Sequence, residues 1–176
     1  LSQQVLSPAK IVTDMNNSIS DNNESNMFVT LIVGILDLET GKLKLCNAGH
    51  NPPILIRPDG QVSFLEFKTQ IFVGVIEEFA YTEDETTLEK GSKLFLYTDG
   101  VTEAENTEKE LYGDEKLLKT LSDNNTSDVR TTVNGIEDSV ADHVKEAEAS
   151  DDLTILLIQY EPGQQTIKHI SLWKEK

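Results

Sequence analysis

The hydrophobic pattern of this chain changes period about two thirds of the way along, and that change limits the folds open to it. From residue 27 to residue 97, short apolar segments rich in β-branched residues alternate with turn residues, as at 58–60. This pattern predicts antiparallel strands joined by hairpins. From residue 116 to residue 144, apolar residues recur at helical spacing instead. The chain is therefore predicted to be an α+β domain in which helices follow a strand-rich segment.

Local signals place the individual elements. Ser7 before Pro8 is typical of a helix start, and this first helix is expected to bury Ile11, Val12, Met15 and Ile19. Residues 27–38 are predicted to form one long, mostly buried strand. Further strands are expected at 42–45, 54–57, 62–67, 79–88, 92–97 and 153–160. A short helix is expected at 116–121, and a longer one after Ser127 or Asp128, with a face formed by Val129, Val133, Ile136, Val140 and Val144.

Length, charge and cysteine content exclude several classes of protein. The 176 residues suit one domain, and 31 Asp and Glu against 15 Lys and Arg give a net charge of −16. Such a surface repels phosphate backbones and anionic lipids, so we expect no nucleic-acid or membrane contact. The single Cys46 excludes an internal disulfide and is expected in the core of a cytoplasmic protein. No signal peptide is visible at the N-terminus. Because the sequence begins with Leu1 rather than Met, we expect a piece of a longer chain.

Polar residues follow predicted strands at three places, residues 97–103, 150–154 and 47–53. At the first, Asp99 and Gly100 end an apolar strand; a carboxylate there is held rigidly and Gly allows close approach to the backbone. At the second, Asp151 and Asp152 precede an apolar strand, where two acids are unfavourable without a cation or hydrogen-bond donors. Carboxylates without Cys ligands favour Mg²⁺ or Mn²⁺ over Zn²⁺.

Each of these segments also has a simpler interpretation. Asp-Gly is a common turn, Asp151 and Asp152 are compatible with a helix cap or a solvated surface, and His50 in the third segment is compatible with a structural role. Residues alone therefore leave two interpretations open, an acidic metal site and a set of ordinary turns.

Taken in order, four segments resemble the PPM-type (PP2C-like) serine/threonine phosphatases of bacteria, in the branch of sporulation stage II protein E and the sigma-factor regulators. The segments are Met27-Phe28-Val29-Thr30-Leu31, Asn47-Ala48-Gly49-His50-Asn51-Pro52-Pro53, Leu96-Tyr97-Thr98-Asp99-Gly100-Val101-Thr102-Glu103-Ala104 and Ser150-Asp151-Asp152-Leu153-Thr154. The resemblance covers residues 7–160. It implies a PP2C-like β-sandwich of antiparallel sheets flanked by helices, with four αββα layers, and it assigns residues 1–162 to a partial catalytic domain. Residues 163–176 lie outside the resemblance and form a tail, whose alternating apolar residues are compatible with one added strand.

The resemblance also implies an activity and a site. Family members hydrolyse phosphoserine or phosphothreonine on proteins with a water activated by two Mn²⁺ or Mg²⁺ ions. Asp99 and Asp151 match the metal-binding, catalytic acids, and Asp152 is a further metal ligand. Gly100 allows close packing beneath the metals, while Asn47, Gly49 and His50 support the site. The implied substrate is a phosphorylated antagonist of an anti-sigma factor, and an upstream sensor domain is expected.

One departure from the family pattern keeps a second function open. The family's first metal motif, an Asp-Gly turn whose Asp bridges both ions, does not occur before the helix that starts after Ser7. We therefore expect the N-terminal strands to be missing and this chain alone to be inactive. The alternatives are a non-catalytic pseudophosphatase or interaction module that keeps the fold, and, more simply, an acidic binder of divalent cations.

Overall fold

The structure of this protein is a computed structural model. It describes residues 6–21, 23, 27–125, 128–147 and 152–163, together with the backbone of 171–172. The chain divides into two compact units, which are described one at a time. Unit 1 comprises Leu1–Pro52 and Glu66–Leu88, and unit 2 comprises Pro53–Leu65 and Glu89–Lys176.

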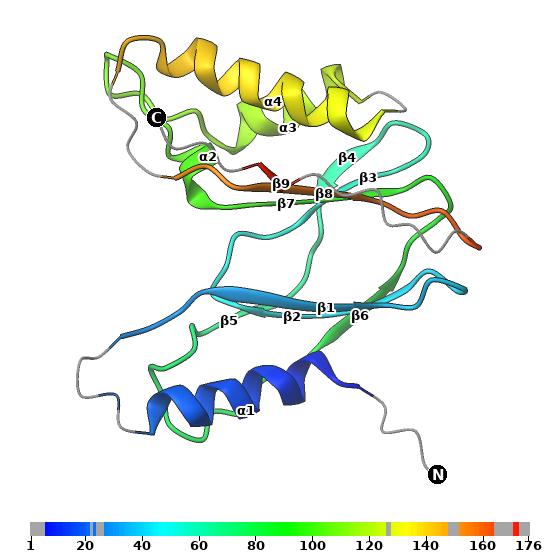
Figure 1. The fold of residues 1–176 in the computed structure, drawn as a ribbon, viewed down its shortest axis with the longest axis vertical. Coiled ribbons are helices and arrows are strands. Elements are labelled where there is room, and N and C mark those ends of the chain that lie inside the picture. The colour runs from blue at the N-terminus through cyan, green and yellow to red at the C-terminus, as the bar shows by residue number, and fades with distance from the viewer. Residues whose placement is uncertain are drawn as a thin grey trace. The chain divides into compact units, whose positions relative to one another are not determined.

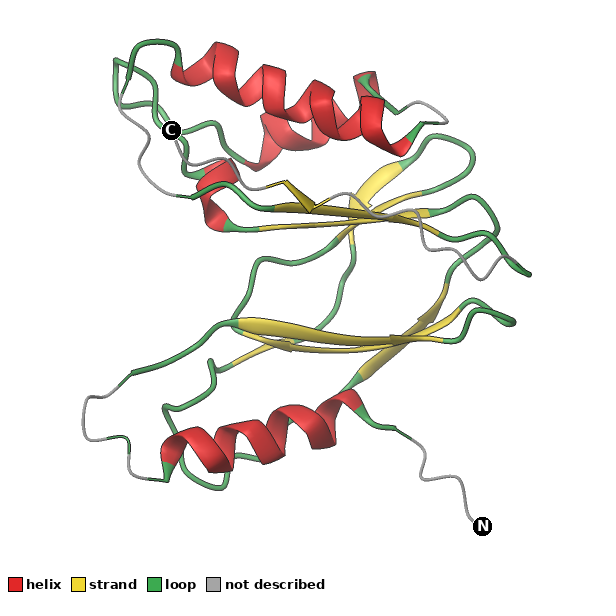
Figure 2. Ribbon diagram, in the orientation of Figure 1, coloured by secondary structure: helices red, strands yellow, loops and turns green. Residues whose placement is uncertain are grey.

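Unit 1 is a small sheet with a helix on one face, and Figures 1 and 2 show α1 along the strands β1 and β2. Its elements are α1 (Pro8–Ser20), β1 (Leu31–Leu36), β2 (Lys42–Ala48), β5 (Thr69–Gln70) and β6 (Asp84–Thr87). The strand β2 lies in the middle, antiparallel to β1 and β6 and parallel to β5. The two-residue parallel pairing with β5 was not expected from the sequence.

The helix α1 begins as its sequence predicts. The hydroxyl of Ser7 accepts a hydrogen bond from the backbone N–H of Lys10, and Pro8 occupies the first turn. The same hydroxyl donates to a carboxylate oxygen of Glu83 at 2.6 Å, and this bond holds the pKa of Glu83 below its usual value. The expected apolar face is partly wrong, because Met15 is exposed and the buried line is Pro8, Val12, Asn16 and Ser20.

Unit 2 is a five-stranded sheet with helices α3 and α4 on one face (Figures 1 and 2). Its elements are β3 (Ile54–Ile56), β4 (Val62–Phe64), β7 (Lys93–Tyr97), α2 (Asp99–Thr102), α3 (Asp114–Asp123), α4 (Val129–Val144), β8 (Ile155–Gln159) and β9 (Ser171–Leu172). The strand order is β4-β3-β7-β8-β9, with every neighbour antiparallel. Of the tail predicted at 163–176, the structure describes Gly163 and β9, which pairs with β8. The domain boundary stays a prediction.

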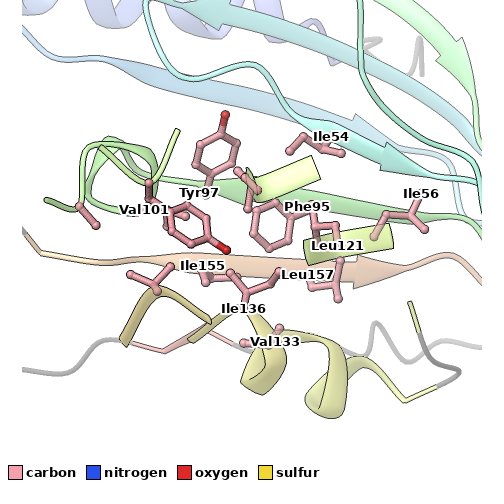
Figure 3. Close-up of a cluster of buried hydrophobic side chains, with 14 of the residues drawn as sticks. Ile54, Ile56, Phe95, Tyr97, Val101, Leu121, Val133, Ile136, Ile155 and Leu157 are labelled. Atoms are coloured by element: carbon pink, nitrogen blue, oxygen red, sulfur yellow. The ribbon is translucent and has the colours of Figure 1, made fainter. Parts of the chain in front are cut away.

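The core of unit 2 lies between this sheet and its helices. Phe95 and Tyr97 point from β7 into a cluster that also takes side chains from the neighbouring strands and from α3 and α4 (Figure 3). Of the two residues predicted as the cap of α4, Asp128 has this role, because it accepts from the N–H of Thr131 at 2.8 Å. Lys93 is also buried on β7, and its ammonium donates to the side-chain oxygen of Asn125 at 2.6 Å. Burial lowers the pKa of Lys93.

The strand predicted at 27–38 differs from the structure in length and in burial. The strand β1 begins only at Leu31, its residues are at best half-buried, and Met27, Phe28 and Val29 are exposed. Within the described residues, β1 pairs with β2 alone and so lies at a sheet edge. An apolar run cannot distinguish an edge strand from a central one, because burial depends on which neighbours pair with it.

Candidate metal centre

The ends of β7 and β8 carry the acidic residues singled out in the sequence, and one threonine joins the two segments. The hydroxyl of Thr98 donates to the backbone carbonyl of Asp152 at 3.2 Å and accepts from the N–H of Thr154 at 3.1 Å. The N–H of Thr98 also donates to the carbonyl of Thr154 at 3.1 Å. These three bonds hold the residue before Asp99 against the backbone of Asp152, so residues distant in sequence come together in unit 2.

Gly100 makes this approach sterically possible. A β-carbon at residue 100 would lie 2.4 Å from the carbonyl oxygen of Asp152 and 2.9 Å from its carbonyl carbon. No larger side chain fits unless one of the two backbones moves. Gly100 thus allows the close packing expected at this position, but between two backbone segments rather than beneath an ion.

The acidic side chains at these strand ends face solvent. Asp99 and Asp152 are both exposed, and one carboxylate oxygen of Asp99 accepts from the N–H of Gly100 at 3.0 Å. Two such carboxylates are hard oxygen donors that suit Mg²⁺ or Mn²⁺. Asp151, which was expected to be a metal-binding, catalytic acid, lies outside the described residues. Among the residues that are described, no three His, Cys, Asp or Glu side chains gather to form a metal site.

The predicted supporting residues form a tight turn in unit 1. The side-chain amide of Asn47, which is buried, donates to the carbonyl of His50 at 2.9 Å and accepts from its N–H at 2.8 Å. Gly49 between them has a φ of 75°, in the left-handed region, and a β-carbon there would lie 2.6 Å from the ring of Phe72. The ring nitrogen Nδ1 of His50 lies 3.3 Å from the hydroxyl of Thr30. The structure therefore brings Asn47, Gly49 and His50 together, in a different unit from Asp99 and Asp152.

Cys46 is fully buried next to this turn, as expected for a core residue. Burial raises the pKa of its thiol to about 11, so the thiol stays protonated at neutral pH. A protonated, inaccessible sulfur is not a nucleophile, so Cys46 does not qualify as an attacking group.

Two asparagines of unit 1 carry contacts that sequence reasoning did not anticipate. Asn16, fully buried on α1, accepts from the N–H of Gly74 and donates to the carbonyl of Ile76, both at 2.9 Å. Asn23 accepts from the N–H of Met27 at 2.9 Å and donates to the carbonyls of Met27 and Gly74. The available signal was the position of Asn16, four residues after Val12 on the buried side of a helix, where a polar side chain needs partners.

With this geometry in hand, comparison with known proteins identifies the family. The family model described as stage II sporulation protein E matches residues 1–161, so the chain belongs to this family of PP2C-type phosphatases. Protein IcfG from Synechocystis is 30% identical over 79% of this chain, and phosphoserine phosphatase RsbU from Bacillus subtilis is 25% identical over 86% of it. The chain spans 22% and 45% of the length of these two relatives, respectively.

Solved structures confirm the fold class predicted from the sequence. The SiaA-PP2C domain of Pseudomonas aeruginosa matches with a TM-score of 0.76 at 19% identity, covering 88% of this chain and 61% of that one. The mixed α+β fold, with antiparallel sheets and helices, is thus that of PP2C-like phosphatase domains. A further solved structure that is similar to this chain is the catalytic domain of the serine/threonine protein phosphatase PstP, which was determined in complex with two manganese ions. No helix in the described part of this chain is long and apolar enough to cross a membrane.

Proposed function

We propose that this chain is part of a metal-dependent protein serine/threonine phosphatase. The observation that carries the proposal is the joining of two acidic strand ends, Asp99 after β7 and Asp152 before β8, through the Thr98 hydroxyl in a PP2C-like fold. The name of the relative RsbU, a phosphoserine phosphatase, supports the substrate class. The manganese ions of a related domain support a divalent cation as cofactor.

In this proposal the residues of the chain have distinct roles. Asp99, Asp151 and Asp152 hold Mn²⁺ or Mg²⁺, and Thr98 and Gly100 keep the two acidic segments together. A divalent cation supplies an activated water nucleophile and charge stabilisation for phosphoryl transfer when it is bound. Cys46 takes no part, because its buried thiol remains protonated.

A substitution that removes the negative charge of Asp99 but keeps the size of its side chain tests this function. In the full-length protein with Mn²⁺, Asp99→Asn is expected to lower hydrolysis of a phosphoserine peptide by at least about 100-fold. The substitution keeps an oxygen that accepts from the Gly100 N–H, so the fold is retained. Binding of Mn²⁺, followed by thermal shift, is expected to weaken in parallel.

A matched control separates this effect from a general loss of negative charge. Asp59 is an exposed acid in the β3–β4 turn and also accepts a backbone hydrogen bond, from the N–H of Gln61 at 3.0 Å. Asp59→Asn is expected to leave hydrolysis unchanged. Undiminished activity in Asp99→Asn contradicts the assignment, and a preference for Ca²⁺ over Mn²⁺ in the same titration favours a simple cation binder.

A non-catalytic pseudophosphatase is the second candidate, and one observation favours it. The family's first metal motif, an Asp-Gly turn, does not occur in this sequence before the helix that starts after Ser7. The intact protein distinguishes the two functions, because a pseudophosphatase neither hydrolyses phosphoserine nor gains thermal stability from Mn²⁺.

The family relationship also supports a finer proposal about the biological substrate. We propose a phosphorylated antagonist of an anti-sigma factor as substrate and an upstream sensor domain as regulator, in a cytoplasmic signalling pathway. Hydrolysis of the phosphorylated antagonist by the full-length protein, compared with an unrelated phosphoprotein at equal concentration, tests this substrate. Equal rates on both contradict it.

A further inference from the structure

Unit 1 displays large apolar side chains on two segments that lie side by side. The exposed apolar residues of these segments, here called the apolar patch, are Met27, Phe28, Val29, Phe72, Val75 and Ile76. Their exposed fractions run from 37% for Phe72 to 68% for Met27. Scattered apolar residues on a surface are ordinary, but a group of them on adjoining segments marks an interaction site.

The two segments of the apolar patch are fastened to each other. Val29 and Val73 exchange two backbone hydrogen bonds of 3.0 Å each. The rings of Phe28 and Phe72 lie with centroids 4.9 Å apart, and the side chain of Asn23 bonds both Met27 and Gly74. A surface held in one conformation loses little entropy when a partner binds.

The helix α1 and the Asn47–His50 turn support the same segments from within unit 1. Asn16 bonds the backbone of Gly74 and Ile76 from its buried position on α1. Phe72 packs so closely on Gly49 that no β-carbon fits there. The buried amide of Asn16 and the packing of Phe72 on Gly49 thus hold the segment 72–76 in a conformation that leaves Val75 and Ile76 in solvent. A partner on the apolar patch would adjoin the turn that carries His50.

The charge around the apolar patch restricts what can bind it. The stretches 11–41 and 69–89, which contain both segments, hold eleven acidic residues and no Lys or Arg. Glu77 and Glu78 follow the patch directly and are exposed, as is Asp21 at the end of α1. Among the ion pairs of the described residues, none involves these three carboxylates.

The acidic surroundings of the apolar patch argue against three kinds of binding partner and favour a fourth. A second copy of the chain would bring a further net charge of −16, and anionic lipids or nucleic acids would be repelled in the same way. We propose that the apolar patch is a docking surface for a cationic amphipathic segment of a partner protein. Apolar side chains of the partner pack on Phe28 and Phe72, and its Lys or Arg side chains lie against Glu77 and Glu78. Such complementarity gives both specificity and a fast encounter.

Two synthetic helical peptides of about 14 residues, or about four turns, test this docking surface on the intact protein. One carries Leu on one face and Lys elsewhere, and the other carries Glu in place of every Lys. By fluorescence anisotropy without metal or substrate, the Lys peptide is expected to bind and the Glu peptide is not. Because no catalysis is measured, this outcome is independent of the proposed phosphatase activity.

Variants then locate the site of binding. Phe28→Ser combined with Phe72→Ser is expected to weaken binding of the Lys peptide at least about tenfold, since both rings are central contacts. Leu111→Ser removes an exposed apolar side chain from unit 2 and is expected to leave binding of the Lys peptide unchanged. Circular dichroism of each variant verifies that the fold is retained.

A charge reversal provides a test that leaves every apolar contact in place. The double variant Glu77→Lys/Glu78→Lys is expected to bind the Lys peptide more weakly than the natural protein does, and to bind the Glu peptide. The proposal is overturned if both peptides bind the natural protein equally, or if the Phe28/Phe72 variant binds as well as the Leu111 variant. It is also overturned if sedimentation shows a dimer that the Phe28/Phe72 variant loses, because the occupant is then a second copy.

Discussion

The two units of this molecule stabilise themselves in different ways. In unit 2, a sheet buries Phe95, Tyr97 and their neighbours beneath α3 and α4 (Figure 3). In unit 1, the corresponding buried cluster around Val12 and Cys46 is smaller, and buried side-chain amides hold its loops. Of the large apolar side chains exposed in the described part of the chain, all but Leu111 belong to unit 1.

This difference assigns different tasks to the units. The packed core of unit 2 fixes the ends of β7 and β8, and with them the backbones of Asp99 and Asp152. Unit 1 uses hydrogen bonds of Asn16 and Asn23 to keep apolar side chains in solvent, which hydrophobic burial alone would not do. Three substitution experiments and one pH titration, given from the largest expected effect to the smallest, test this contrast between the two units.

Truncating an aromatic ring should have very different effects in the two units. Phe95→Ala removes a fully buried ring and is expected to lower the free energy of unfolding by about 3–5 kcal/mol. Phe28→Ala, with the ring more than half exposed, is expected to change it by about 0.5 kcal/mol or less. Urea unfolding of both variants measures the difference, and similar losses would contradict the contrast.

A methyl group at Gly100 should disturb the joined strand ends. Gly100→Ala forces a β-carbon to within 2.4 Å of the Asp152 carbonyl and is expected to cost about 3 kcal/mol. The matched control is Gly34→Ala in β1, where the nearest atom to a β-carbon is 3.6 Å away, an ordinary contact. Thermal unfolding compares the two; a Gly100 variant as stable as the Gly34 variant rules out the tight approach.

Removing the Asn16 amide tests how far unit 1 depends on polar contacts. Asn16→Ala leaves the N–H of Gly74 and the carbonyl of Ile76 without their partner, and is expected to cost about 2 kcal/mol. Hydrogen exchange of the Gly74 amide is expected to accelerate. The matched control is Asn17→Ala on the exposed side of the same helix, which should leave the exchange of Gly74 unchanged.

The thiol of Cys46 predicts a small dependence of stability on alkaline pH. Because burial raises the folded-state pKa to about 11 from an ordinary value of 9.0, the unfolded chain releases this proton first as the pH rises. The stabilisation that this group contributes is therefore fully present below pH 9 and is lost as the pH rises from 9 to 11, with a loss of about 1.4 kcal/mol at pH 10. Urea titrations of the natural protein and of Cys46→Ala are to be compared; equal slopes across this window contradict the buried thiol.

Local signals in the sequence were sufficient for most elements. Ser7 and Asp128 begin α1 and α4 as predicted, because a capping side chain acts within its own helical turn. The two hairpins follow from turn residues at 39–42 and 58–60 in the same way. The candidate acids were also recognisable, since Asp99-Gly100 directly follows an apolar strand. Their role as metal ligands stays a prediction, and so does that of Asp151.

Tertiary structure decided everything that depends on partners distant in the sequence. Residues 27–38 read as one buried strand, yet pairing on one side leaves β1 at an edge and Phe28 in solvent. The hydroxyl of Thr98 meets Asp152 across 54 positions, and Asn16 meets Gly74 across 58. Hydrophobic period and capping are set within a few residues and can be read from sequence. Exposure and close approach arise only when separate strands and loops pack together, which no local pattern encodes.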